Sequence, residues 1–136
     1  MVRHDSVAAV LLAAGRSRRM GAFKPLLPFG GRSVVETCVA NLLEAGASEV
    51  VVVVGHRGEE VRAALARETR VRFAVNDIEG SEMGVSVARG VEAVNAEAKA
   101  VLVALVDYPA VPPGAVESLL EARARTGARL VVPEWR

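Results

Sequence analysis

Cysteine is nearly absent from this 136-residue chain, in which Cys38 is the only one. A single cysteine cannot form an intrachain disulfide, and it excludes a cysteine-based metal centre. The fold must therefore be stabilised by its apolar residues, which make up 51% of the chain. Because Cys38 lies among apolar residues at helical spacing, we interpret it as a small buried side chain rather than a reactive thiol.

An excess of charge is absent as well. The 17 Lys and Arg residues balance 16 Asp and Glu residues to a net charge of +1, which does not favour a nucleic-acid or membrane-surface partner. The longest β-branched block, at 50–54, is far too short to cross a bilayer. The N-terminus has no signal-peptide pattern. We therefore expect a cytoplasmic protein.

Two well-known phosphate-binding motifs are also missing. The dinucleotide fingerprint requires a glycine two positions after the first one, but Ser17 stands two positions after Gly15. The P-loop requires four residues between its glycines, whereas five residues separate Gly15 from Gly21. Any phosphate loop in this chain must be of another kind.

Apolar runs alternate with amphipathic segments along the whole chain. Val, Leu and Ala fill predicted strands at 7–13, 50–54, 71–75, 100–106 and 130–132. Between them, helical spacing predicts helices that begin at Ser33, Glu59, Met83 and Pro112. The first has the capping box Ser33-x-x-Glu36, and the third has an apolar stripe of Met83, Val87, Val91 and Val94.

This alternation predicts an α/β fold. Strands that are apolar throughout and separated by single helices imply a mostly parallel sheet covered on both faces. Right-handed crossovers then make it a doubly wound, three-layer α/β/α sandwich. With no linker or internal repeat, we expect one domain over residues 1–136.

A basic loop follows the first strand. Gly15 and Gly21 allow a ligand to approach the backbone closely, and the segment up to Lys24 carries four positive charges. A triphosphate is the ligand that such a loop suits best.

The carboxyl ends of the other strands carry polar residues. Parallel strands place their ligand at this edge, so His56, Asn76 and Asp107 should lie near the basic loop. Asp107 is suited to hold Mg2+, although it could instead cap the following turn. His56 is more easily read as a solvated residue than as a substrate contact. We interpret Asp77, Glu79 and Glu82 as a solvated loop rather than a second metal site.

The segment from Leu12 to Lys24 resembles the signature of the MobA-like NTP transferases, Leu-Ala-(Ala/Gly)-Gly-x-Ser-x-Arg-Met-Gly-x-x-Lys. Nine positions agree: Leu12, Ala13, Ala14, Gly15, Ser17, Arg19, Met20, Gly21 and Lys24. The resemblance implies a Rossmann-like nucleotidyltransferase fold of the GT-A type. It also implies that Arg19 and Lys24 hold the β- and γ-phosphates, that Leu12, Ala13, Ala14, Gly15 and Ser17 bind the nucleotide, and that Asp107 binds Mg2+.

The loop after the third strand is similar to a second family pattern, Asn…Gly-x-x-x-Ser-(Leu/Val)-x-x-Gly. The resemblance implies that Asn76, Gly80 and Ser86 contact the base and ribose. Without it, the segment would read as an ordinary polar loop that opens a helix.

Within the family, Leu-Ala-Ala-Gly is typical of the molybdenum cofactor cytidylyltransferases. The resemblance therefore implies a Mg2+-dependent transfer of CMP from CTP to molybdopterin, with a homo-oligomer or a molybdoenzyme as partner. A sugar phosphate or an isoprenoid-precursor phosphate is the alternative acceptor, because the loop does not encode the acceptor.

Family members continue beyond this point into a Gly-x-x-Gly-His-Pro segment, whereas this chain stops at Arg136. We therefore expect a domain that is truncated at its C-terminus. A second hypothesis is a non-catalytic nucleotide-binding module, or half-site, which a partner completes.

Overall fold

The computed structural model describes residues 6–14, 23–78, 80–107 and 111–128. Four strands form a parallel sheet in the order β5-β4-β1-β6. Their bounds are Val7–Leu12 for β1, Glu49–Val54 for β4, Val71–Val75 for β5 and Ala100–Leu105 for β6. The predicted strand at 130–132 lies outside the described residues.

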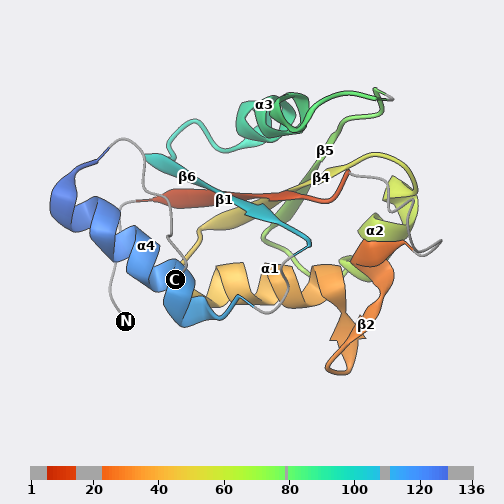
Figure 1. The fold of residues 1–136 in the computed structure, drawn as a ribbon, viewed down its shortest axis with the longest axis horizontal. Helices are drawn as coiled ribbons and strands as arrows, with labels where there is room; N and C mark the ends of the chain where they lie inside the picture. Colours follow the sequence, from red (N-terminus) through yellow and green to blue (C-terminus); the bar gives the residue numbers. More distant parts are fainter. Residues whose placement is uncertain (1–5, 15–22, 79, 108–110, 129–136) are drawn as a thin grey trace.

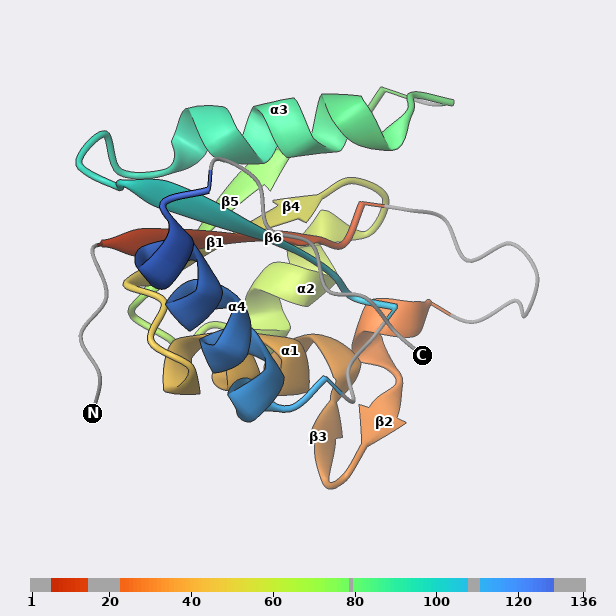
Figure 2. The same cartoon turned by 60° about the vertical axis from the view of Figure 1, so that its left-hand side comes forward.

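The helices lie on both faces of the sheet. Helix α3 (Met83–Ala93) covers one face, and α1 (Val34–Glu44), α2 (Gly58–Ala64) and α4 (Pro113–Thr126) lie on the other (Figures 1 and 2). The predicted α/β sandwich with a parallel central sheet is confirmed.

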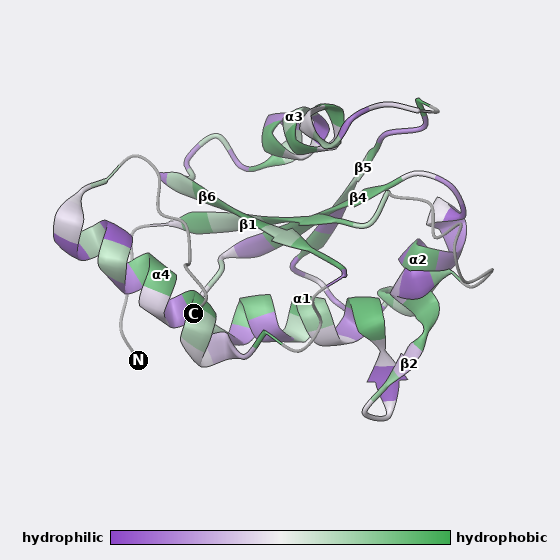
Figure 3. Ribbon diagram, viewed as in Figure 1, coloured by the Kyte–Doolittle hydropathy of each residue, from purple (hydrophilic) through white to green (hydrophobic). Residues whose placement is uncertain are grey.

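Strand β1 lies at the centre of the molecule. It pairs with β4 on one side and β6 on the other, so that Val10 stands opposite both Val51 and Val103. All six of its residues are buried, which explains why the segment is apolar throughout rather than alternating. The continuous hydrophobic colouring of β1 is visible in Figure 3.

Helix α1 forms as its sequence predicts. The Ser33 hydroxyl accepts a hydrogen bond from the Glu36 backbone N–H at 3.3 Å, and the Glu36 carboxylate accepts one from the Ser33 N–H at 3.1 Å. Hydrogen bonds from the Ser33 hydroxyl and backbone lower the pKa of Glu36. Cys38 is buried on the inner face, and burial raises the pKa of its thiol to about 11.

Helix α3 corrects one prediction. Met83 is 59% exposed and Val91 is 41% exposed, so they do not belong to the inner face. Ser86 and Gly90 are buried there instead, and Val87 and Val94 pack on the sheet beside them. The buried face of α3 is therefore rotated relative to the predicted apolar stripe, because the small side chain of Ser86 and the absence of one at Gly90 allow the helix backbone to lie close to the central strands.

Helix α4 begins after Pro112 and is capped at its C-terminal end by Gly127, which has a left-handed φ of 69°. Proline at the start and glycine at the end match the prediction. Val116 and Leu120 bury its inner face. Within the described ranges, no helix combines the length and the apolar character that crossing a membrane requires.

A short ribbon between β1 and α1 was not predicted. Strands β2 (Pro28–Phe29) and β3 (Arg32–Ser33) pair antiparallel around Gly30 and Gly31. Both glycines have positive φ values, 59° and 86°, as a tight two-residue hairpin turn requires. The single-turn 3-10 helix η1 (Lys24–Leu26) precedes the ribbon.

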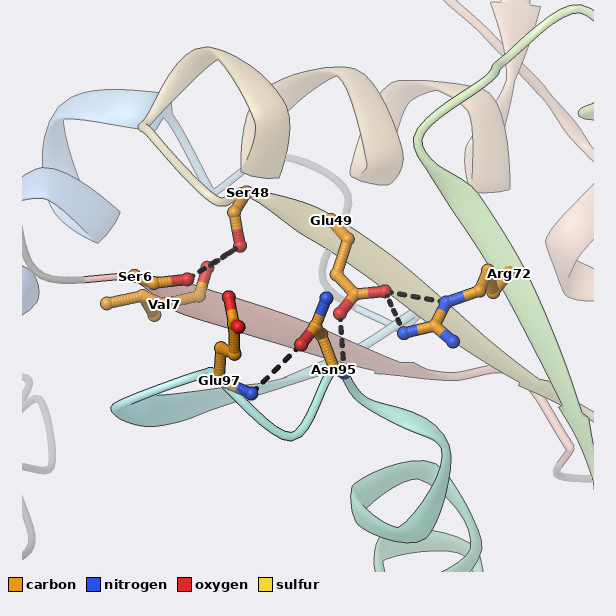
Figure 4. A network of polar contacts seen from close by, with 7 residues as sticks. All are labelled: Ser6, Val7, Ser48, Glu49, Arg72, Asn95 and Glu97. Carbon is orange, nitrogen blue, oxygen red and sulfur yellow. Dashed lines mark hydrogen bonds and ion pairs between the residues drawn. The ribbon is translucent and has the colours of Figure 1, made fainter.

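A polar network closes the amino end of the sheet (Figure 4). The Glu49 carboxylate accepts hydrogen bonds from Arg72 Nε at 2.8 Å and from the Asn95 backbone N–H at 2.7 Å. Asn95 Oδ1 in turn accepts one from the Glu97 N–H. Glu49 therefore joins β4, β5 and the turn after α3, at the end opposite the predicted site.

Candidate functional site

The carboxyl ends of the four described strands meet at one edge of the sheet, as parallel pairing dictates. Ala14 follows β1, Gly55 follows β4, Asn76 follows β5 and Asp107 follows β6. Backbone hydrogen bonds extend the pairing past the strand ends, from Asn76 N–H to the Val54 carbonyl at 2.8 Å. The loops that leave this edge are therefore held side by side.

Lys24 and Asp107 meet at this edge. The Lys24 ammonium lies 3.3 Å from Asp107 Oδ1, although 83 residues separate the two in sequence. Their side chains are 44% and 54% exposed, so the pair is open to solvent and contributes little to stability. An exposed pair at the strand ends can therefore exchange its mutual contact for a ligand at small cost.

A cavity of about 410 Å³ opens beside this pair. It lies between the ends of β1 and β6, the loop after β5 and the first turn of α3. The residues that line it are Leu12, Ala14, Lys24, Pro25, His56, Asn76, Asp77, Ile78, Gly80, Ser81, Glu82, Met83, Ser86, Leu105, Val106 and Asp107. The wall is thus mixed, with apolar strand ends and a polar loop.

Asn76 organises the polar wall. Its side-chain amide donates to Ser81 Oγ at 3.0 Å and to Ser86 Oγ at 2.8 Å, and its Oδ1 accepts from the Ile78 backbone N–H at 3.2 Å. Asn76 is only 7% exposed. One buried amide therefore ties the loop after β5 to helix α3.

Gly55 brings two strand ends unusually close. A β-carbon at Gly55 would lie 2.6 Å from the Asn76 carbonyl oxygen, a distance that no side chain tolerates. Gly80, further along the same loop, has a φ of +75°, which favours glycine. The course of the backbone along this side of the cavity therefore requires glycine at both positions.

Phe23, the residue before Lys24, is held by contacts with the loop after β4. Phe23 is 9% exposed, and its ring lies edge-on to His56 at 6.5 Å between centroids and is covered by the Arg57 guanidinium at 4.7 Å from its centroid. Arg57 has a left-handed φ of 63° and pairs with Glu60. This ion pair raises the pKa of Arg57 and lowers the pKa of Glu60. The loop after β4 thereby supports the position of Lys24.

The structure brings most of the sequence-predicted site residues together. Among the predicted residues, those that line the cavity are Leu12, Ala14, Lys24, Asn76, Gly80, Ser86 and Asp107. Ala13 is buried beneath them, and its N–H donates to the Val53 carbonyl at 2.9 Å. Gly15, Ser17 and Arg19 lie outside the described residues. His56 also borders the cavity.

A metal ion would have few protein ligands here. Within residues 6–14, 23–78, 80–107 and 111–128, no three His, Cys, Asp or Glu side chains are grouped to hold one. Asp107 is an exposed carboxylate at the cavity. Mg2+ commonly uses one or two carboxylates together with substrate phosphates and water, so Asp107 fits that mode of binding.

Sequence reasoning missed Ser81, Phe23 and Arg57. Ser81 stands in a polar loop where any residue could be solvated, and no motif singles it out. The contact of Arg57 with Phe23 joins residues from two loops and has no local signal. Only the apolar character of Phe23 within a polar segment hinted at burial.

Comparison with known proteins identifies the family. Residues 9–136 match the model of the MobA-like NTP transferase domain. The chain belongs to this family. The match covers almost the whole chain, and it agrees with the resemblance of the segment from Leu12 to Lys24.

Curated relatives differ widely in length and name. The bifunctional protein GlmU of Geobacter metallireducens is 33% identical over 128 residues, which are 93% of this chain and 27% of that protein. Nicotine blue oxidoreductase of Paenarthrobacter nicotinovorans is 40% identical over 115 residues, which are 84% of this chain and 55% of that protein. The chain therefore spans about a quarter of the length of GlmU and just over half of the length of nicotine blue oxidoreductase.

Solved structures agree with the fold. A nucleotidyl transferase from Methanothermobacter has a TM-score of 0.78 and 36% identity, and the match covers 86% of this chain and 57% of that one. A CMP:2-keto-3-deoxy-manno-octonic acid synthetase complexed with CTP has a TM-score of 0.71 and 27% identity, covering 90% and 49%.

Proposed function

We propose that this chain is a nucleotidyltransferase that moves a nucleoside monophosphate, CMP from CTP, onto the phosphate of an acceptor and releases pyrophosphate. The observation that carries the proposal is the contact of Lys24 with Asp107 at 3.3 Å. It brings the cation that we propose to bind phosphate beside the carboxylate that we propose to bind a metal, and both line the cavity. Membership of the MobA-like NTP transferase family supports the same reaction.

In this reaction the protein acts mainly by positioning and charge. The acceptor phosphate attacks the α-phosphorus in line, and pyrophosphate leaves on the opposite side. Arg19 and Lys24 hold the β- and γ-phosphates and stabilise the charge that develops on the leaving group. Asp107 would hold Mg2+, which would supply positive charge to neutralise the phosphates.

The cavity wall accommodates the nucleoside. We expect the backbone from Ala13 to Gly15 to meet the base, and Leu12, Ala14 and Ser17 to take part in binding the nucleotide. Asn76, Gly80 and Ser86 form the opposite wall of the nucleotide site.

CTP is the nucleotide that we favour. The tetrapeptide Leu12-Ala13-Ala14-Gly15 is typical of molybdenum cofactor cytidylyltransferases, and one solved structure of similar fold is described as complexed with CTP. We accordingly propose molybdopterin as the acceptor. A sugar phosphate or an isoprenoid-precursor phosphate is the alternative, and the GlmU relatives make the comparison with UTP essential.

A second candidate function is nucleotide binding without transfer. The chain spans little more than half of a relative that is named an oxidoreductase. In that case this chain supplies a nucleotide-binding half-site, and other residues supply the chemistry.

Two measurements separate these candidates. Thermal unfolding with CTP, GTP, ATP or UTP, each with and without Mg2+, tests binding, and we expect selective stabilisation by CTP with Mg2+. Pyrophosphate release with molybdopterin tests transfer. Asp107→Asn, which keeps the shape of the side chain, should abolish release. Binding without release in the unsubstituted chain would support the half-site, and no stabilisation by any nucleotide would refute both.

A further inference from the structure

The direction of the Asn76 amide is fixed by its surroundings. The Ile78 backbone N–H can only donate, so the atom that faces it at 3.2 Å is the amide oxygen. The amide nitrogen must then face Ser81 and Ser86, and each of its two protons has one hydroxyl oxygen as acceptor. Both donors of Asn76 are therefore used within the protein, and none remains for a ligand.

This direction determines how the two serines are oriented. A hydroxyl has one proton and two lone pairs. Because Ser81 and Ser86 accept from Asn76, their own protons must point away from it. Neither hydroxyl donates to another group in the described part of the chain. Ser86 is only 7% exposed, and both serines line the cavity.

We propose that Asn76 is a positioning residue that turns the hydroxyl protons of Ser81 and Ser86 into the cavity, so that this wall selects ligands with two neighbouring hydrogen-bond acceptors. Asn76 then acts through the serines rather than by touching the ligand. A buried hydroxyl proton without a partner is costly, so a ligand that supplies acceptors is preferred over one that supplies a donor.

The consequence for nucleotide choice rests on the proposed function. Cytosine carries adjacent acceptors at O2 and N3, and guanine carries them at O6 and N7. Uracil instead carries a donor, its N3–H, between its two carbonyl acceptors. This donor would face one of the two serine hydroxyl protons, which are donors as well. Both serine oxygens lie within 3.0 Å of one nitrogen and are therefore close enough to act on one edge of a base.

Asn76→Asp is the direct test, because it replaces the NH2 group by an acceptor of nearly the same shape. The Ile78 N–H keeps its acceptor, but both serine hydroxyls now donate to residue 76 and offer the cavity only lone pairs. Affinities for CTP, GTP and UTP are measured by calorimetry for the unsubstituted chain, for Asn76→Asp and for the double variant Ser81→Ala/Ser86→Ala. The triple variant combines Asn76→Asp with both serine substitutions and is measured in the same way.

We expect the preference for CTP or GTP over UTP to fall about tenfold in Asn76→Asp, the order of one or two lost hydrogen bonds. The added negative charge weakens all triphosphates alike, so the ratio of affinities is unaffected by it. Ser81→Ala/Ser86→Ala should lose the same preference, and Asn76→Asp should then change the ratio no further. A change in ratio that persists without the serines would mean that Asn76 contacts the base itself, and would overturn the proposal.

A nucleotide-independent measurement keeps the two proposals separable. In Asn76→Asp, the introduced carboxyl group accepts two hydroxyl donors, which favours its charged form. Its pKa from NMR titration should therefore be lower than in the triple variant. An equal pKa in both would overturn the role of Asn76 even if CTP binds. Should the unsubstituted chain bind no nucleotide, the proposed function fails, and this titration alone decides the orientation of the serines.

Discussion

Gly90 lies directly against Val10. A β-carbon at Gly90 would be 2.3 Å from Val10 Cγ1 and 3.0 Å from Val53 Cγ2. Helix α3 thus rests on the two central strands at a glycine that faces the sheet, and this contact determines how closely the helix approaches the sheet.

Gly90→Ala should destabilise the protein. Val10 and Val53 are fully buried, so neither can move aside, and overpacking of this kind costs about 1–3 kcal/mol. Gly84→Ala in the same helix is the matched control, because nothing lies within 4 Å of its added methyl group. Helix propensity should make the control neutral or about 0.5 kcal/mol more stable. Equal midpoints in urea for the two variants would contradict the packing argument.

Lys24→Ala should weaken triphosphate binding more than monophosphate binding. A lost charge-assisted hydrogen bond reduces affinity about tenfold or more, and only the triphosphate has the β- and γ-phosphates that Lys24 is proposed to hold. Lys99→Ala removes an exposed lysine at the opposite end of the sheet and serves as the control. Equal losses for CTP and CMP would exclude the assignment to the terminal phosphates.

Ser33→Ala should remove the capping box of α1 at a cost of about 1 kcal/mol. It should also change the response to acid. Because the pKa of Glu36 is lowered by folding, its contribution is present above the unfolded value near 4.5 and is lost as the pH falls through the folded value. The difference in unfolding free energy between Ser33→Ala and the unsubstituted chain should therefore be smaller at pH 3 than at pH 7. A constant difference between them would show that the cap does not depend on the carboxylate.

Glu49→Gln should cost about 1.5–3 kcal/mol, the range for hydrogen bonds to a charged group. The Glu49 side chain is 13% exposed and accepts hydrogen bonds from both Arg72 and Asn95. In Glu49→Gln, the NH2 group of the introduced glutamine would face one of these two donors, so that one hydrogen bond would be lost. Glu59→Gln is the control, because that carboxylate is 95% exposed and 3.8 Å from Arg62. Chemical denaturation of both variants measures the difference, and similar losses would argue against the role of the network.

Cys38 should resist alkylation in the folded protein. Burial raises the pKa of its thiol from 9.0 to about 11, so little thiolate forms at pH 8, whereas the chain unfolded in guanidinium should react with iodoacetamide readily. The raised pKa also means that stability is lost as the pH rises from 9 to 11, by about 1.4 kcal/mol per unit. Cys38→Ala should remove this part of the pH dependence; rapid labelling of the native protein would contradict the burial.

The central sheet and the meeting of Lys24 with Asp107 could be predicted because each depends on a simple rule. Unbroken apolar segments such as Val50–Val54 indicate buried parallel strands, and parallel strands direct their carboxyl ends to one edge. The capping box at Ser33 is a local pattern with a local cause. These features need no knowledge of which particular atoms touch.

Other features depend on contacts that sequence spacing does not contain. The inner face of α3 is determined by the close approach of Gly90 to Val10, and an apolar stripe through Met83 and Val91 could not reveal it. The roles of Ser81 and of Arg57 over Phe23 arise from separate loops meeting in space. Polar residues in loops give no local signal of the partner that they find.

The contact between Gly55 and the Asn76 carbonyl has a consequence for how this protein can diverge. Because a side chain at position 55 would displace the loop after β5, the two loops cannot change independently. Variants with a larger residue at 55 are expected to need compensating insertions or a rerouted backbone near 76–81. Exposed residues that line the cavity, such as His56 and Met83, are not tied in this way. New ligand preferences are therefore expected to arise by substitution at these exposed positions, while the two strand ends that meet at Gly55 and Asn76 stay as they are.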